Sequence, residues 1–154
     1  MDCYHCHTSF TYHFAHSGFG DEDFFYCDQC GAVAIVDWYS KQYRPFYEKY
    51  IHKNSYEAQK PESLAKFSKD KHDMLIEISQ HLATCPCGGK FTIDAAPRCP
   101  YCKKRLLWKK IRELLQLPYT PNNVLPSARD DWSNNVYYFI FNDRPIFRNF
   151  WMGK

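Results

Sequence analysis

The chain has 154 residues and a formal net charge of +3, and 45% of its residues are hydrophobic and 18% aromatic. This composition supplies enough apolar surface for one compact domain or two small modules, and it excludes a disordered, highly charged chain. No run of about 18 apolar residues occurs and the first residues lack a signal-peptide pattern, so we expect neither a membrane span nor a secretion signal.

The first part of the chain contains two close cysteine pairs with strand-like sequence around them. Both pairs have the spacing C-x-x-C: Cys3/Cys6 and Cys27/Cys30. Residues 7–14 alternate polar and aromatic side chains, which predicts a half-buried strand, and the apolar run 32–36 predicts a second strand. Gly31 directly follows the second pair, where a tight turn needs a positive φ.

Two amphipathic helices are predicted in the middle of the chain. Between Trp38 and Ile51 aromatic residues recur at helical spacing, and Pro45 fits only near the start of such a helix. The polar residues 53–60 predict a loop. A helix of about six turns is predicted from Pro61 to about Thr84. Its apolar face is formed by Leu64, Phe67, Lys71, Met74, Leu75, Ile78 and Leu82.

A second cysteine-rich region follows this helix at once. Its pairs are Cys85/Cys87, with one intervening residue, and Cys99/Cys102, with two. The short alternating run 90–94 predicts a strand, and Gly88 again suits a turn with a positive φ. A third amphipathic helix is predicted over 103–117, with its leucines inward and its lysines and arginines outward.

The end of the chain changes character. Residues 118–135 include three prolines and four asparagines, which predicts a loop. The apolar runs 136–141 and 146–151, separated by a turn at 142–145, predict a β-hairpin. A hairpin of this kind is not stable alone and must pack on the rest of the chain or on a partner.

The cysteines favour metal binding over other chemistry. A tetrahedral zinc site needs four thiolates, and two tight turns supply them. Disulfides would need export, iron would use the same cysteines, and a thioredoxin-like function would need one pair at a helix start. Because no redox-partner motif accompanies the cysteines, we expect two structural zinc ions. The ligands are Cys3, Cys6, Cys27, Cys30, Cys85, Cys87, Cys99 and Cys102.

The spacers between the pairs suggest how they combine. We expect sequential pairing, with the first two pairs on one ion and the last two on the other. The alternative is an interleaved arrangement like a RING-type cross-brace, in which the first and third pairs share an ion. The spacer of more than fifty residues between Cys30 and Cys85 argues against it, since closing a long loop costs entropy.

Each cysteine-rich region, with a cysteine turn, a strand and a second cysteine turn, resembles a zinc ribbon. The resemblance is specific for metal and weak for function, because zinc ribbons serve many unrelated proteins. It covers about residues 1–37 and 84–104, and with the predicted helices and hairpin it gives an α+β fold: two zinc-ribbon β modules connected and packed by three amphipathic helices, with a C-terminal β-hairpin. The expected segments are a ribbon at 1–37, a helical connector at 38–83, a second ribbon at 84–104, a helix at 105–117, a loop at 118–135 and the hairpin at 136–154.

The sequence contains no recognisable catalytic motif. It lacks a nucleophile elbow, a phosphate-binding glycine loop and an H-E-x-x-H helix, and four thiolates leave no open position on a metal. We therefore expect a non-catalytic, cytoplasmic protein that binds another protein, as an adaptor or as an inhibitor of the immunity-protein type. The expected contact residues are Tyr137, Tyr138, Phe147, Phe150 and Trp151.

Nucleic-acid binding is the alternative function. Each Zn(Cys)4 centre carries a charge of −2, so two centres lower the formal charge of +3 to about −1. A phosphate-binding surface would therefore depend on a local patch, which the third predicted helix offers. The cations of this patch are Lys103, Lys104, Arg105, Lys109, Lys110 and Arg112.

Overall fold

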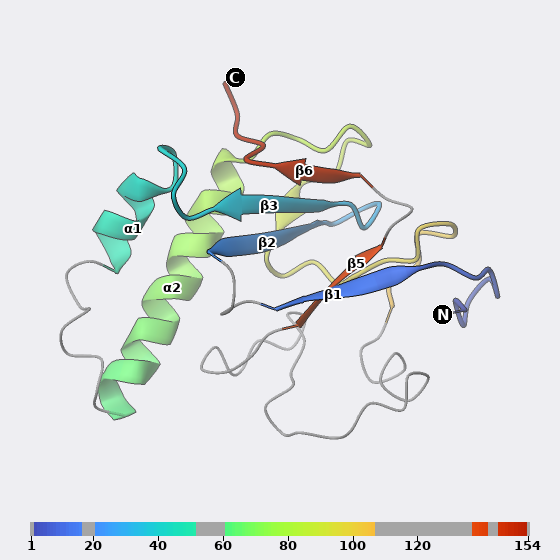
Figure 1. Ribbon diagram of the computed structural model, residues 1–154, viewed down its shortest axis with the longest axis horizontal. Helices are drawn as coiled ribbons and strands as arrows, with labels where there is room; N and C mark the ends of the chain where they lie inside the picture. Colours follow the sequence, from blue (N-terminus) through green and yellow to red (C-terminus); the bar gives the residue numbers. More distant parts are fainter. Residues whose placement is uncertain (1, 17–20, 52–60, 107–136, 142–144, 154) are drawn as a thin grey trace.

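The computed structural model describes residues 2–16, 21–51, 61–106, 137–141 and 145–153, shown in colour in Figure 1. Over these residues the chain forms two helices, a four-stranded mixed sheet and a two-stranded sheet. The α+β class is therefore confirmed. Among the described helices, none has the length and apolar character needed to cross a membrane.

The four-stranded sheet has the strand order β4-β2-β3-β6. Strands β2 (Glu22–Cys27) and β3 (Val33–Asp37) form an antiparallel hairpin at its centre. Strand β4 (Phe91–Thr92) adds antiparallel to β2, and β6 (Ile146–Arg148) adds parallel to β3. Figure 1 shows β6 lying beside β3, although more than a hundred residues separate them in the chain.

Both faces of the β2–β3 hairpin are buried, because alternate side chains enter two different hydrophobic clusters. Phe25 and Val36 belong to the larger cluster, and Phe24 and Ile35 belong to a smaller one on the other face, closed by Ala95. This explains why the sequence around β3 reads as a continuous apolar run instead of an alternating one.

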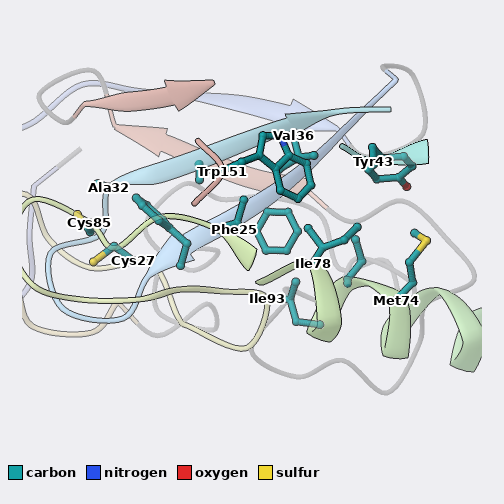
Figure 2. Packing of buried hydrophobic residues seen from close by; sticks show 14 of the residues in the cluster. Phe25, Cys27, Ala32, Val36, Tyr43, Met74, Ile78, Cys85, Ile93 and Trp151 are labelled. Carbon is teal, nitrogen blue, oxygen red and sulfur yellow. The ribbon is translucent and has the colours of Figure 1, made fainter. Parts of the chain in front are cut away.

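Helix α2 (Pro61–His81) supplies the other side of the larger cluster. Its residues Met74 and Ile78 are 1% and 0% exposed, and Figure 2 shows Ile78 facing Phe25. Helix α1 (Arg44–Tyr50) packs beside α2 and has Pro45 in its first turn.

Asp23 is buried beside this cluster at 3% exposed, and its carboxylate contacts three donor groups. Its carboxylate accepts hydrogen bonds from Trp38 Nε1 at 2.8 Å and from the Tyr43 hydroxyl at 2.9 Å. Lys71 Nζ lies 3.3 Å from the second oxygen and 4.7 Å from the centre of the Trp38 ring. Burial and the Asp23 charge raise the pKa of Tyr43, so its hydroxyl remains a donor. These contacts join β2, α1 and α2.

The predicted middle helices are partly confirmed. The helix predicted from Pro61 to about Thr84 is α2, three residues shorter at its end, whereas the helix predicted over 38–51 begins only at Arg44. Most of the third predicted helix, 107–117, lies outside the described residues. Residues 103–106 are not helical, because Lys103 has a φ of 61° and Arg105 pairs with Arg98 in a β-bridge.

The predicted C-terminal β-hairpin is wrong. Strand β5 (Tyr137–Phe141) pairs antiparallel with β1 (Tyr12–His16), while β6 joins the other sheet beside β3. The physical reason is burial: Phe147 in β6 and Phe150 after it pack against the larger hydrophobic cluster. The segment boundaries given from the sequence stay predictions.

Substituting Asp23 tests the buried polar cluster. We expect Asp23→Ala to lower the free energy of unfolding by about 2–4 kcal/mol, because Tyr43 and Trp38 would keep buried donors without an acceptor and Lys71 would lose its partner. The adjacent Glu22→Ala is the matched control. Glu22 pairs with Arg148 at the surface, so its loss should cost less than about 1 kcal/mol. Urea unfolding of both variants measures the difference, and equal effects would contradict a structural role for Asp23.

Candidate metal centres

The eight cysteines gather into two groups of four, and within each group all sulfur atoms lie within 4.8 Å of one another. The first centre is Cys3, Cys6, Cys99 and Cys102. The second centre is Cys27, Cys30, Cys85 and Cys87. All eight residues predicted as ligands therefore take part in one of the two centres.

The sulfur–sulfur distances fit a tetrahedral metal site. In the first centre the Sγ atoms of Cys3 and Cys102 are 3.8 Å apart. In the second centre the distance is 3.4 Å between Cys27 and Cys87, and 3.7 Å between Cys30 and Cys85. A metal about 2.3 Å from each of four sulfurs places them about 3.8 Å apart, whereas a disulfide would need about 2.05 Å. Each group could thus hold one metal ion.

The three C-x-x-C turns share one backbone geometry. In each, the first cysteine C=O accepts a hydrogen bond from the N–H four positions on, and its N–H donates to the C=O five positions on. The residue directly after the second cysteine of each turn has a positive φ: 57° at His7, 77° at Gly31 and 61° at Lys103. Glycine adopts this conformation freely, whereas His7 and Lys103 adopt it at about 1–2 kcal/mol each.

The Cys85/Cys87 turn is the same turn with one residue removed. Gly88 N–H donates to the Cys85 C=O, Cys85 N–H donates to the Gly89 C=O, and Gly88 has a φ of 89°. Each feature therefore occurs one position earlier than in the longer turns. Gly89 also lies against the second centre, since a Cβ at this position would be 2.5 Å from Cys27 Sγ.

The thiols of the two centres differ widely in acidity. Burial raises the pKa of Cys27 to about 11, whereas hydrogen bonds with the side chain and backbone of Thr8 lower the pKa of Cys6 to about 6. Burial also raises the pKa of Cys87, but the Gly89 N–H and the neighbouring thiols outweigh it and lower the value to about 7. Four adjacent thiolates need a cation to offset their repulsion, which a metal ion supplies.

The predicted sequential pairing is wrong, and so is the interleaved alternative. The first cysteine pair joins the fourth and the second joins the third, so the centres are nested. The second centre lies within the chain segment that the first centre closes, and we call them the inner and the outer centre. Pairing of β2 with β4 is the physical reason for the inner centre, because it places Cys27 opposite Phe91. Asp28 completes the contact: its N–H donates to the Lys90 C=O at 3.0 Å, and its carboxylate accepts from the Lys90 N–H at 2.9 Å.

The outer centre is joined by two side chains that the sequence did not single out for this role. The Tyr4 hydroxyl donates to the Arg105 C=O at 3.3 Å, and His5 Nε2 donates to the same oxygen at 3.0 Å. These bonds connect the turn at Cys3 to the hairpin around Cys99. The sequence shows that a tyrosine and a histidine lie between two ligands. It does not show what they bind, because their common partner is a backbone oxygen about 100 residues later.

The predicted contact residues fall into two groups. Trp151 is 5% exposed and belongs to the larger hydrophobic cluster, while Phe147 and Phe150 are partly buried against it. These three side chains therefore serve the core. Tyr137 and Tyr138 lie in β5, where only the backbone is described.

The predicted basic patch is only partly within the described residues. Lys103, Lys104 and Arg105 are exposed, but they lie on the hairpin around Cys99 and not on a helix. Lys109, Lys110 and Arg112 lie outside the part of the chain that the structure describes.

A family model described as a domain of unknown function, DUF8255, matches residues 1–107. The chain belongs to the DUF8255 family. The matched region holds both centres and the four cysteine turns of this DUF8255 protein. No curated protein matches the chain, and no solved structure matches it.

Two double variants distinguish the nested pairing from the sequential one. Cys6→Ser/Cys102→Ser should retain one metal ion per chain, because both residues belong to the first centre. Cys6→Ser/Cys30→Ser should retain none, because it removes a ligand from each centre. Native mass spectrometry with elemental analysis gives the counts, against two expected for the unaltered chain. Sequential pairing would reverse the two results, and each variant controls for the loss of two thiols in the other.

Gly89→Ala tests the close packing of the second centre. We expect it to weaken metal binding at this centre, because the added Cβ would overlap Cys27 Sγ and Asp28 Oδ1, 2.7 Å away. Gly88→Ala is the matched control, since a Cβ there meets no atom within 4 Å. Its only cost is the backbone strain of alanine at a positive φ, about 1–2 kcal/mol. Competition with a chromophoric chelator measures both, and equal metal affinity in the two variants would contradict the packing argument.

Proposed function

We propose that each centre binds one zinc ion and that the two ions have a structural role. Four cysteine ligands form the closed shell typical of structural zinc, with no position left for water or substrate. Thiolate ligands in a tetrahedron also favour zinc or iron over magnesium and calcium. The elemental analysis of the paired cysteine variants identifies the metal as well as counting it, and iron in place of zinc would contradict this assignment.

The zinc ions would hold together segments that are distant in the sequence. The first centre joins a turn at the start of the chain to one 93 or more residues later, and the second closes the segment that carries α1 and α2. Metal binding of this kind contributes directly to folding, because the unfolded chain has no preformed site. The metal ions would therefore stabilise the fold, and the function would depend on residues at the protein surface.

We propose further that the protein is a non-catalytic module that binds another protein. The supporting observation is a pair of exposed tyrosines around α1: Tyr39 is 79% exposed and Tyr47 is 39% exposed, although both flank the buried Tyr43. Tyrosine is enriched at the centres of protein interfaces because its ring supplies contact area and its hydroxyl a hydrogen bond. A hydrogen bond to Asp21 raises the pKa of Tyr39, so the hydroxyl is kept protonated.

We propose this surface as the binding site in place of the C-terminal residues expected from the sequence. It contains Tyr39 and Tyr47, with the carboxylates of Asp21 and Glu48 exposed nearby in the chain. An adaptor and a dedicated inhibitor are both compatible with it. In either case we expect the partner to present an apolar centre surrounded by polar groups.

Copurification from the native host tests the proposal. The tagged chain should retain one protein in stoichiometric amount, and Tyr39→Ser/Tyr47→Ser should reduce its recovery by about tenfold or more, because tyrosine anchors each contribute about 1–2 kcal/mol or more. Ile146→Ser is the control, since Ile146 is 42% exposed and pairs with Val33, at the end of β3 away from α1. An unchanged recovery with the tyrosine variant, or the same loss with the control, would contradict a binding surface at α1.

A further inference from the structure

The hairpin around the first centre presents a compact group of cations beside an aromatic ring. Lys103, Lys104 and Arg105 are exposed, Arg98 is partly exposed, and Tyr101 is 51% exposed. We call these five residues the knuckle face. All of them lie on or next to the turn that carries Cys99 and Cys102.

The backbone of the knuckle face is held in place from several sides. Lys104 C=O accepts from the Cys99 N–H, and Arg98 Nη1 donates to the Lys103 C=O, both at 3.0 Å. The Arg105 C=O accepts from Tyr4 and His5 of the opposite turn. Because these contacts use only backbone atoms of Lys103, Lys104 and Arg105, their charged groups are presented to solvent from a fixed frame. A preorganised surface loses less entropy on binding.

The cations of this face have no ion pair with any residue that the structure describes. The ion pairs found there involve other cations: Arg44, Lys49, Lys71, His72 and Arg148. Asp2 is the acidic group on the opposite turn of the first centre, and the Ser9 hydroxyl donates to it. The four cations exceed the combined charge of Asp2 and a zinc-loaded centre, and their long side chains extend the positive charge beyond the buried sulfurs.

We propose that the knuckle face binds single-stranded nucleic acid, with Lys103, Lys104 and Arg105 contacting phosphates and Tyr101 stacking on a base. Cations next to an exposed ring are the elements of sequence-tolerant single-strand binding. A protein partner fits this face less well, because Tyr101 is its one large exposed hydrophobic residue among those described and protein interfaces need an apolar centre. A duplex also fits less well, since the described face is a set of tight turns with no helix or long ribbon to enter a groove.

Fluorescence anisotropy with labelled, mixed-sequence single-stranded DNA and RNA of about 20 nucleotides tests the proposal. We expect binding at about 50 mM salt that weakens with salt at a log–log slope of about −2, as three phosphate contacts predict. Lys104→Gln/Arg105→Gln should weaken binding by about tenfold and bring the slope to about −1. Tyr101→Ala should weaken binding by about fivefold or more with the slope unchanged.

Lys41→Gln/Arg44→Gln is the matched control, because it removes the same charge from exposed residues at α1. It should change the affinity by less than about twofold. The inference rests on the proposed zinc only because the metal would fix the turn that carries Cys99 and Cys102. Metal content is therefore measured in every variant and must equal that of the unaltered chain. A loss of metal in the lysine–arginine variant would show that it disturbs the first centre, and the metal-retaining Tyr101→Ala would then decide whether the face binds nucleic acid.

Three results would overturn the proposal. The first is no binding at low salt by the metal-loaded chain, and the second is equal weakening by the control and knuckle-face variants. The third is tighter binding of poly-glutamate or of a duplex than of the single strand, which would assign the face to an acidic protein or to double-stranded nucleic acid. Selective loss with the knuckle-face variants would support it.

Discussion

The nested arrangement of the two cysteine centres is the constraint on which the rest of the structure depends. The inner centre closes a loop that contains α1 and α2, and the outer centre joins the turns that flank this whole unit. The turn between β2 and β3 and the turn just before β4 carry the cysteines of the inner centre, and β2 pairs with β4. Strand pairing and the clustering of the cysteines therefore specify the same approach of two chain segments, so each reinforces the other.

Loop-closure entropy did not decide the pairing, because it changes slowly with loop length. Closing the spacer between Cys30 and Cys85, a separation of 55 residues, costs under about 1 kcal/mol more than closing one of about 20 residues. Burial of Met74, Leu75 and Ile78 against the sheet outweighs this difference, since one buried side chain of this size contributes about 1.5–3 kcal/mol. A ligand spacing identifies the ligands, whereas the packing between them decides which ones meet.

The sequence predicted the features that depend on local patterns. The helical spacing of Met74, Ile78 and Leu82 predicted α2, and all eight cysteines join a centre. The glycines at 31 and 88 have the positive φ that their turns require. His7 and Lys103 hold the same turn position without a glycine, so composition carried no signal for them and the shared turn was visible only in the structure.

The features that the sequence did not predict depend on contacts between distant segments. The tail was read as one hairpin because its two apolar runs are adjacent, yet β5 pairs with β1 and β6 pairs with β3. Strand β2 was not predicted as an element, although Phe24, Phe25 and Tyr26 form its buried centre. A run of three aromatics is ambiguous alone, because it shows no periodicity until both faces of the sheet are known to be covered.

The two proposed binding surfaces lie at opposite ends of the central hairpin. Strand β2 begins at Glu22, which is paired with Asp37 near the exposed Tyr39, and it ends at Cys27 of the inner centre. Exposed side chains of both signs lie around α1, among them Lys41, Arg44 and Glu48, whereas the exposed cations of the knuckle face lie around the first centre; Figure 1 shows α1 and the N-terminal turn on opposite sides of the molecule. Because the frame keeps α1 and the knuckle face apart, the two proposed surfaces would not compete for one ligand.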